Sequence, residues 1–368
     1  MTPSARTQAR MRWASALAAT LLGATLLGGC AAQPASTGTS GDAAVDEETC
    51  ARNKAAGTIT YISAYGYSAS AGQLDVFLAD ELGYFDDLCL DVEINASGAN
   101  GQQLVAAGQA QFTALGSAAD VMLSASHTEN LTAVATYGTE PPFSIFANEK
   151  IQSLKDLEGG TLGYFINLTP VASAMLDNAG VDASRVEMIK MTSYDPTVVV
   201  RGQVDAIVGY ASNQPQTLRA QNLPFAEFFP HEFDVQGTYN VMEVNTPFLE
   251  EHRETAADFM RASLKALRFC LDDSEECIDM LADLAEENGQ GAAFPKDQLA
   301  RTWEVESQWV RDSRGGNPGV QTPAMWESEH ALVQQYGEVK DLPQIADMMD
   351  AELVADLYDG DTLIWPEN

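Results

Sequence analysis

Positive charge is scarce in this sequence: 20 Lys and Arg residues stand against 53 Asp and Glu residues, a formal net charge of −33 in 368 residues. Such a surface repels phosphate backbones and anionic lipid head groups, which argues against nucleic-acid binding and against electrostatic attachment to a membrane. The 28 glycines and 15 prolines are an ordinary share, which argues against a fibrous or mainly disordered chain. These features exclude classes of protein but identify no function.

Catalytic motifs are also lacking. The chain has no G-x-S-x-G turn, no Walker loop and no H-E-x-x-H pair. Its 4 histidines are scattered, and no cysteine spacing resembles a zinc site. The segment Gly159-Gly160-x-x-Gly163 leads from a turn into a predicted strand, whereas a dinucleotide fingerprint follows a strand and opens a helix. We therefore expect no catalytic residue, no metal and no cofactor. A ligand-binding role, which needs only a cleft with a few polar groups, stays open.

The N-terminal segment is typical of an export signal. Three arginines precede residues 13–27, an apolar stretch too short for a comfortable membrane span. The stretch ends in Leu-Gly-Gly-Cys at residues 27–30, which resembles the bacterial lipobox. We expect a signal peptide over residues 1–29 and lipid attachment at Cys30; the alternative is an ordinary secretory signal with an incidental cysteine. In the first case the chain lies outside the cytoplasmic membrane, anchored by lipid.

Residues 30–48 are rich in Ala, Ser, Thr, Gly and acidic residues, and they show no apolar periodicity. This composition cannot bury enough surface to offset the entropy of ordering, so it predicts a flexible tether. Beyond it no run of eighteen apolar residues occurs.

The remaining cysteines are four in number, an even count that favours disulfides in an oxidising compartment. Cys270 and Cys277 flank an Asp-Asp-Ser turn, so a local bridge between them is expected. Cys50 would then pair with Cys89 and tie the start of the folded region to it. The alternative is four free, buried thiols.

The folded region alternates β-forming runs with amphipathic helical segments, which predicts an α/β architecture with mostly parallel strands. A first set of strands is expected at residues 58–62, 90–94, 110–115, 132–137 and 143–146. A second set is expected at residues 161–164, 186–190, 205–208 and 225–228, followed by a strand that runs back at 240–244. A mostly helical tail follows, so the simplest arrangement is two α/β lobes with a helical C-terminal part.

Several segments resemble the type II solute-binding proteins of ABC importers, in particular the NMT1/THI5-like (SsuA/THI5-like) family. The similar segments, in the family's order, are Leu82-Gly-Tyr-Phe85 with Leu90-Asp-Val-Glu-Ile94, residues 97–112 (SGANGQQLVAAGQAQF), residues 153–163 (SLKDLEGGTLG), Gly202-Gln-Val-Asp-Ala-Ile-Val-Gly-Tyr210 with Ser212-Asn-Gln-Pro215, and the helix that begins at Thr246-Pro-Phe-Leu-Glu250. Each match is weak alone, but together they indicate the family.

The resemblance implies the type II periplasmic-binding-protein fold, in which two α/β lobes joined by two crossover strands close on a ligand. It places lobe 1 at residues 57–146 plus 245–368 and lobe 2 at residues 147–240. The crossovers are expected near Phe146–Asn148 and Tyr239–Val244.

Ligands in such folds lie at the carboxyl ends of strands and at helix N-termini, where loops of both lobes meet. The loops at these places carry tyrosines, amides and hydroxyls but no Lys or Arg. The predicted ligand-binding residues are Tyr65, Tyr67, Ser68, Asn100, Ser117, Tyr137, Asn167, Thr169, Tyr210, Asn213 and Tyr239. Each of these tyrosines could instead serve packing.

Tyrosines with amides suit a flat, neutral heterocycle, because rings stack on its faces while amides reach its edges. The resemblance allows thiamine-pyrimidine precursors and riboflavin-like ligands as well as sulfonates, taurine or nitrate. We favour a heterocycle, since the loops lack a cation for a bare anion. The expected partners are a small-molecule ligand, an ABC permease with its ATPase, and the membrane through the lipid anchor, with the protein itself a monomer.

Two other classes remain as alternatives. THI5-type synthases of the thiamine pyrimidine share the fold that the resemblance implies, but they carry clustered cysteines that this chain lacks. A lipoprotein that only contacts a partner would need no cleft. A closed, tyrosine-lined cavity between the lobes would distinguish a binding protein from such a scaffold.

Overall fold

The computed structural model describes residues 45–96, 98 and 100–366, which belong to one compact unit, Gly41–Asn368. The predicted signal peptide, Cys30 and most of the predicted tether lie outside the described residues. The tether was expected to reach residue 48, but helix α1 (Glu47–Ala55) already begins at residue 47. The side chain of Asp46 caps this helix by accepting the N–H of Thr49 at 2.8 Å. No helix of the described part is long and apolar enough to cross a membrane.

The first sheet has the strand order β2-β1-β3-β10-β4. Its strands are β1 (Thr58–Ile62), β2 (Asp91–Asn95), β3 (Phe112–Leu115), β4 (Leu131–Gly138) and β10 (Tyr239–Asn245). Strand β1 is parallel to β2 and β3, whereas β10 is antiparallel to both of its neighbours, β3 and β4. The strand predicted to run back therefore does so, and all of its residues are buried between its neighbours and the covering helices.

The second sheet repeats this pattern with the order β7-β6-β8-β5-β9. Its strands are β5 (Phe143–Asn148), β6 (Thr161–Tyr164), β7 (Glu187–Lys190), β8 (Ala206–Tyr210) and β9 (Phe225–Phe228). Strand β6 is parallel to β7 and β8, and β5 is antiparallel to β8 and β9. The prediction of mostly parallel strands is confirmed: four strands of each sheet run in one direction, and the fifth, which follows a passage of the chain from the other sheet, runs against both of its neighbours.

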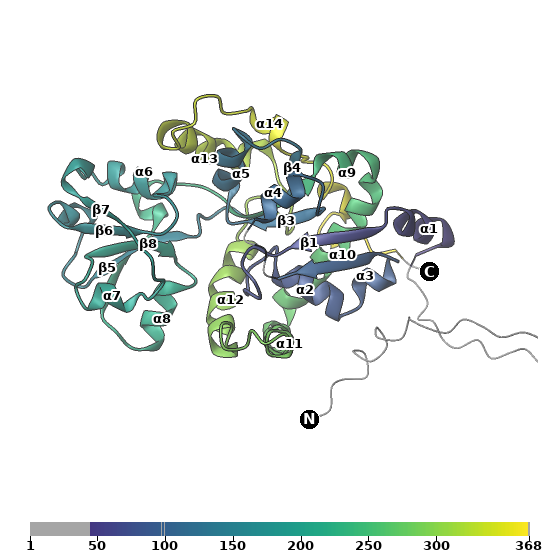
Figure 1. Cartoon of the computed structure of the whole chain (residues 1–368), viewed down its shortest axis with the longest axis horizontal. Helices are drawn as coiled ribbons and strands as arrows, with labels where there is room; N and C mark the ends of the chain where they lie inside the picture. The colour runs from purple at the N-terminus through teal and green to yellow at the C-terminus, as the bar shows by residue number, and fades with distance from the viewer. Residues whose placement is uncertain (1–44, 97, 99, 367–368) are drawn as a thin grey trace, which may run out of the picture. The chain divides into compact units, whose positions relative to one another are not determined.

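Helices cover both faces of the first sheet (Figure 1). Helices α2 (Leu74–Glu81) and α10 (Arg253–Asp272) pack on one face, where Phe112 stacks on Phe259 with ring centroids 4.1 Å apart. Helices α5 (Ala118–Ala125) and α13 (Pro323–Tyr336) contribute Met122 and Trp326 to a separate core on the other face. The remaining helices of this part are α3 (Tyr84–Asp87), α4 (Gly101–Ala106), α9 (Thr246–Glu251), α11 (Ser274–Glu287), α12 (Lys296–Arg311) and α14 (Ile345–Met348).

The second sheet is likewise covered on two faces, because successive strand residues point to opposite sides. Ile145 and Val208 belong to the core beneath α6 (Pro170–Asn178). Phe146 and Ile207, one position away, belong to a smaller core that includes residues of α7 (Thr197–Val200) and α8 (Gln214–Ala220). We call the first sheet with its helices lobe 1, and residues 143–228 with the second sheet lobe 2.

The chain passes between the sheets twice, from β4 to β5 through residues 139–142 and from β9 to β10 through residues 229–238. The expected crossover at Phe146–Asn148 lies inside β5, and the one at Tyr239–Val244 lies inside β10, so both expected boundaries are displaced by a few residues. The reason is pairing: Phe143 already pairs with Tyr210 of the second sheet, and Tyr239 already pairs with Gly138 of the first.

Two disulfides reinforce lobe 1. Cys50 of α1 is bonded to Cys89, which follows α3, and Cys270 of α10 is bonded to Cys277 of α11. This is the pairing expected from the sequence. The first bridge fastens the N-terminal helix to the domain, and the second holds two consecutive helices together. Each removes freedom from the unfolded chain, by an amount that grows with the length of the closed loop.

Candidate functional site

A cavity of about 420 Å³ lies between the two lobes. Loops that follow β1 and β3 of lobe 1 and β6, β7 and β8 of lobe 2 open onto it, together with helix α12. These loops follow the carboxyl ends of parallel strands, which is where α/β sheets place their ligands. The volume lies within the usual range for small-molecule sites. The protein therefore has a shaped site for a small ligand at the meeting point of its lobes.

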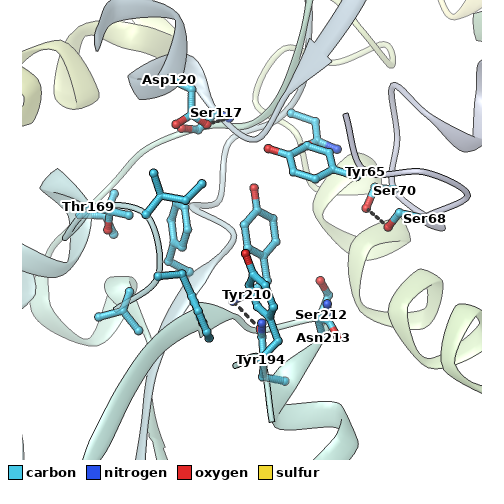
Figure 2. A pocket seen from close by; sticks show the side chains of 18 of the residues that line it. Tyr65, Ser68, Ser70, Ser117, Asp120, Thr169, Tyr194, Tyr210, Ser212 and Asn213 are labelled. Carbon is cyan, nitrogen blue, oxygen red and sulfur yellow. Dashed lines mark hydrogen bonds between the residues drawn. The ribbon is translucent and has the colours of Figure 1, made fainter. Parts of the chain in front are cut away.

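The lobe 1 wall is mostly polar. Asp120 lies in the first turn of α5, and its Oδ2 accepts the backbone N–H of Ser117 at 3.1 Å. Ser68 and Ser70, in the loop after β1, lie with their hydroxyl oxygens 3.0 Å apart. Figure 2 shows Ser117 and Asp120 on one side of the cavity and the two serines of the loop on another. This wall offers hydroxyl and carboxylate groups on a rigid frame.

Glu306 of α12 joins the polar wall to the rest of the fold. Its Oε1 accepts a hydrogen bond of 2.5 Å from the hydroxyl of Ser212, a residue of lobe 2. Its Oε2 accepts from the hydroxyl of Tyr239 at the start of β10. Both carboxylate oxygens of Glu306 are therefore engaged by the protein, one of them across the boundary between the lobes.

The lobe 2 wall is mostly aromatic and aliphatic. Phe143 and Tyr210 meet edge to face with centroids 5.0 Å apart, and Phe165 and Tyr194 stack at 4.4 Å. Ile166, next to Phe165, is 74% exposed and Tyr194 is 66% exposed, which is unusual for side chains of this size. An exposed apolar rim at a cavity indicates a surface that a ligand or the facing lobe can cover.

The two walls already touch at one side of the cavity. The backbone oxygen of Ser212 accepts from the hydroxyl of Thr302 at 3.1 Å, and the side-chain oxygen of Asn213 accepts from Gln298 at 3.3 Å. The rings of Tyr65 and Tyr210, one from each lobe, are 6.5 Å apart (Figure 2). A ligand in this cavity would therefore contact both lobes at once.

The site has a negative character. Burial raises the pKa of Asp120 to about 6, and burial raises that of Glu306 to about 7. Burial, followed by the charge of Asp120, raises the pKa of the Tyr65 hydroxyl, so this group is neutral at physiological pH. Among the described residues that line the cavity there is no Lys, Arg or His. The wall thus offers hydrogen-bond acceptors and neutral hydroxyls, but no cation.

Seven of the eleven predicted residues lie on the cavity wall: Tyr65, Ser68, Ser117, Asn167, Thr169, Tyr210 and Asn213. Thr169 also caps α6 by accepting the N–H of Ala172 at 3.1 Å. The structure brings together loops that lie up to about 150 residues apart along the chain, as the resemblance to the two-lobed fold implied.

The structure does not place the other four predicted residues on the wall. Tyr67 is buried and stacks on Phe77 at 4.6 Å. Tyr137 is buried in β4 and donates to Asp75 at 3.1 Å.

Tyr239 is also buried and lies behind the wall, where its hydroxyl donates to Glu306 and accepts the N–H of Ala71. Asn100 is exposed at the start of α4, away from the cavity. A position next to the end of a strand therefore does not by itself place a side chain on the cavity wall. Three of the four side chains that do not line the cavity are tyrosines that serve packing and internal hydrogen bonds.

Sequence reasoning missed several lining residues. Asp120 was one of many acidic residues, but it stands at the third position of a Ser-x-x-Asp helix start, a signal that could have singled it out. Phe294 and Glu306 come from the helical tail, where no local pattern marks a ligand contact. Tyr194 lies in the loop after β7, which was not among the candidate loops.

No three His, Cys, Asp or Glu side chains of the described chain come together as a metal site would require. The arrangement as a whole is that of a two-lobed binding protein: two mixed sheets, two passages of the chain between them, and a ligand-sized cavity where the lobes meet. The family model described as "NMT1/THI5 like" matches residues 72–277, and the chain belongs to this family.

A relative of known function supports the same grouping. The formylaminopyrimidine-binding protein of Halalkalibacterium halodurans is 28% identical over 265 residues, which are 68% of this chain and 78% of the relative.

Solved structures show the shared fold. The aliphatic sulphonate-binding protein SsuA of Escherichia coli superimposes with a TM-score of 0.60 at 13% identity, covering 79% of this chain and 91% of that one. The ligand-binding component of an ABC-type import system from Staphylococcus aureus gives a TM-score of 0.59 at 12% identity, covering 81% and 98%. The desulfurization enzyme DSZB gives 0.58 at 11% identity, covering 81% and 98%. The protein has the periplasmic-binding-protein fold, which serves both binding proteins and at least one enzyme.

Proposed function

We propose that this protein is a solute-binding protein that captures a small, flat, nitrogen-containing heterocycle of the pyrimidine class between its lobes and delivers it to an ABC permease. The observation that carries the proposal is the composition of the cavity wall, in which aromatic rings of lobe 2 face hydroxyl and carboxylate groups of lobe 1. Rings can cover the faces of a flat heterocycle, and the polar groups can bind its edge.

The curated relative supports the pyrimidine class, because its name states that it binds a formylaminopyrimidine. The similarity is 28% over most of both chains, so it supports the ligand class rather than the individual compound. A riboflavin-like heterocycle is a second ligand of the same chemical kind.

The second candidate function is binding of a sulfonate, taurine or nitrate, which the fold shared with SsuA brings into consideration. An anion needs N–H donors, from Lys, Arg or exposed backbone. The described part of the cavity wall has no Lys or Arg, and it has carboxyl groups at Asp120 and Glu306. The electrostatics of the wall therefore favour the heterocycle over the anion.

Capture of the ligand follows from the difference between the contacts that it makes in the open and in the closed arrangement of the lobes. A ligand that touches both lobes stabilises the closed arrangement, because those contacts are incomplete when the lobes are apart. The closed form would then dock on the permease, whose ATPase drives uptake. We further propose that the protein acts as a monomer and is held at the outer side of the cytoplasmic membrane by lipid on Cys30, which lies outside the described residues.

We propose a role without catalysis. The fold alone does not decide this point, because DSZB shares it. What supports the proposal is that the acidic group Glu306 is already engaged by Ser212 and Tyr239, and that the rest of the wall, apart from the carboxyl group of Asp120, is made of hydroxyl, amide and apolar side chains. Incubation of the protein with a bound pyrimidine, followed by mass spectrometry, should return the ligand unchanged.

The test of the ligand class is thermal stabilisation of the purified protein by a panel of aminopyrimidines, thiamine, riboflavin, taurine, alkanesulfonates and nitrate. A ligand at about 100 times its Kd should stabilise the fold by roughly 2.7 kcal/mol, which raises Tm by several degrees. Stabilisation by pyrimidines is the expected result. Stabilisation by sulfonates or nitrate alone would establish the second candidate, and no stabilisation by any compound would refute both.

A further inference from the structure

Asp120 differs from Glu306, the other acidic residue that lines the cavity, in having acceptor capacity to spare. Glu306 is engaged at both oxygens, and Glu243 of β10 accepts from Gln102 at 2.9 Å. Glu329 of α13 accepts the N–H and the hydroxyl of Thr238 at 3.0 and 2.6 Å and does not line the cavity. Asp120 accepts one backbone N–H, from Ser117, and faces the cavity.

A second polar group stands beside Asp120. The hydroxyl of Ser117, a residue only 1% exposed, lines the cavity and forms a capping box with Asp120 at the start of α5. A hydroxyl that accepts a backbone N–H as a helix cap still has its own O–H to donate. Figure 2 shows Ser117 and Asp120 side by side at one end of the cavity, with the hydroxyl of Tyr210 pointing toward them. This end of the cavity is a polar pocket within an otherwise aromatic site.

The charges around Asp120 are all of one sign. Glu243 of β10 and Glu329 of α13 lie near enough for their charges to interact with it, as do the hydroxyls of Tyr65 in the loop after β1 and of Tyr210 at the end of β8. Glu306 of α12 lines the same cavity. Burial, and in addition the charge of Asp120, raises the pKa of both Glu243 and Glu329 to about 7. No described cation lines the cavity to balance Asp120. The surroundings of Asp120 therefore provide no positive group to balance its charge. A proton, or a hydrogen-bond donor on the ligand, could supply that balance.

We infer that Asp120 recognises the amino-substituted edge of the ligand's ring and shares one proton with it, so that the site selects amino-substituted nitrogen heterocycles over anions and over rings without the amine. The inference rests on the proposed function. A carboxyl group and an aminopyrimidine edge fit each other as a pair: one oxygen accepts from the exocyclic amine, and the other shares a proton with the ring nitrogen. Ser117 and Tyr210 lie where their hydroxyls can complete this end of the site.

The proton balance of binding follows. With a pKa of about 6 in the free protein, Asp120 is mostly ionised at neutral pH, so the complex must take one proton from solvent. Raising the pH removes this proton and weakens binding. Above the pKa values of the free protein and the free ligand, Kd should rise by up to about tenfold for each pH unit.

The experiment measures binding of 4-amino-2-methylpyrimidine and of 2,4-dimethylpyrimidine, in which a methyl group replaces the amine, by calorimetry from pH 6 to pH 8. Each titration is run in two buffers of different ionisation enthalpy, which reports the protons taken up. We expect uptake that approaches one proton at pH 8 and an affinity for the methyl analogue that is weaker by at least about tenfold.

Two substitutions of Asp120 test whether this residue holds the proton that is taken up on binding. D120N keeps an oxygen for Ser117 and offers an N–H₂ donor to the ring nitrogen, so we expect it to bind within about tenfold of the parent at pH 7 with no proton uptake. D120L should lose on the order of 100-fold. D75N, which neutralises a buried acidic residue that has a raised pKa, lies off the wall and has no electrostatic interaction with Asp120, is the matched control and should keep the parent's pH dependence. Melting curves without ligand verify that each variant is folded.

The outcomes separate the two proposals. If no aminopyrimidine binds the parent protein, the proposed function fails and this inference fails with it. If aminopyrimidines bind but Kd is flat from pH 6 to pH 8 without proton uptake, the function stands and the inference is wrong. A pH dependence that persists in D120N would place the proton on another group and also overturn the assignment to Asp120.

Discussion

The two walls of the cavity are built on different physical principles. The lobe 1 wall carries hydroxyl and carboxyl groups that are buried and held by hydrogen bonds, such as Glu306 between Ser212 and Tyr239. The lobe 2 wall carries rings and aliphatic side chains, two of which, Ile166 and Tyr194, are largely exposed. The polar groups of lobe 1 are already held in place by hydrogen bonds and can bind the edge of a ligand. The apolar rim of lobe 2 is still exposed to solvent. We therefore propose that the polar groups of lobe 1 set the specificity for the ligand and that the apolar rim of lobe 2 favours closure.

The largest effect is expected from the aromatic wall. Tyr210→Ala removes the ring at the centre of the lobe 2 wall, and loss of one stacking ring should weaken ligand binding by roughly 5- to 100-fold. Isothermal titration calorimetry with the ligand identified by the thermal-stability panel measures the change. Tyr67→Phe is the matched control, because Tyr67 packs on Phe77 off the wall, and its affinity should equal the parent's. Equal losses in both variants would show that the assignment of wall and core is wrong.

An intermediate effect is expected where the two walls meet. A Cβ added to Gly116 would lie 2.0 Å from the Tyr210 hydroxyl and 3.0 Å from Asp120 Oδ2, so Gly116→Ala must push the tyrosine away from the polar wall. We expect Kd to rise by about tenfold. Removing the hydroxyl relieves the clash, so Gly116→Ala combined with Tyr210→Phe should recover most of the loss. A double variant no better than Gly116→Ala alone would contradict the proposed contact.

The smallest effect is expected at the rim. Ile166→Ser changes a side chain that is 74% exposed without ligand, so the free energy of unfolding of the ligand-free protein should change by less than about 0.5 kcal/mol. If closure covers part of this residue, the affinity should fall about fivefold, since covering part of one aliphatic side chain contributes about 1 kcal/mol. Chemical denaturation and calorimetry measure the two quantities. An unchanged affinity would show that residue 166 stays exposed in the complex.

Most of the local structure could be predicted from the sequence. The strands at Thr58–Ile62, Thr161–Tyr164 and Phe225–Phe228 were expected at the residues where they occur. Alternation and amphipathic spacing are local signals, and burial on two faces enforces them. The direction of β5 could not be read in this way, because the same alternation fits a parallel and an antiparallel neighbour.

The site could be predicted only in part. Tyr65 and Tyr210 were found because they follow strands whose carboxyl ends meet at the cavity. Tyr137 and Tyr239 satisfy similar local criteria, yet their rings turn into the core of lobe 1. Which way a side chain turns depends on neighbours such as Asp75 and Glu306 that are distant in sequence, and a local pattern carries no information about them.

The amino-acid sequence alone was enough to predict the acidic surface, the cysteines available for the two bridges, most strands and helices of both lobes, and the family. These follow from composition, periodicity and short motifs. That Asp120 and Glu306 line the same cavity, and that no described cation joins them there, becomes visible when the chain is folded. The reason is physical: the charge and pKa of a buried group depend on what surrounds it in space, and those surroundings are assembled from segments far apart in the chain.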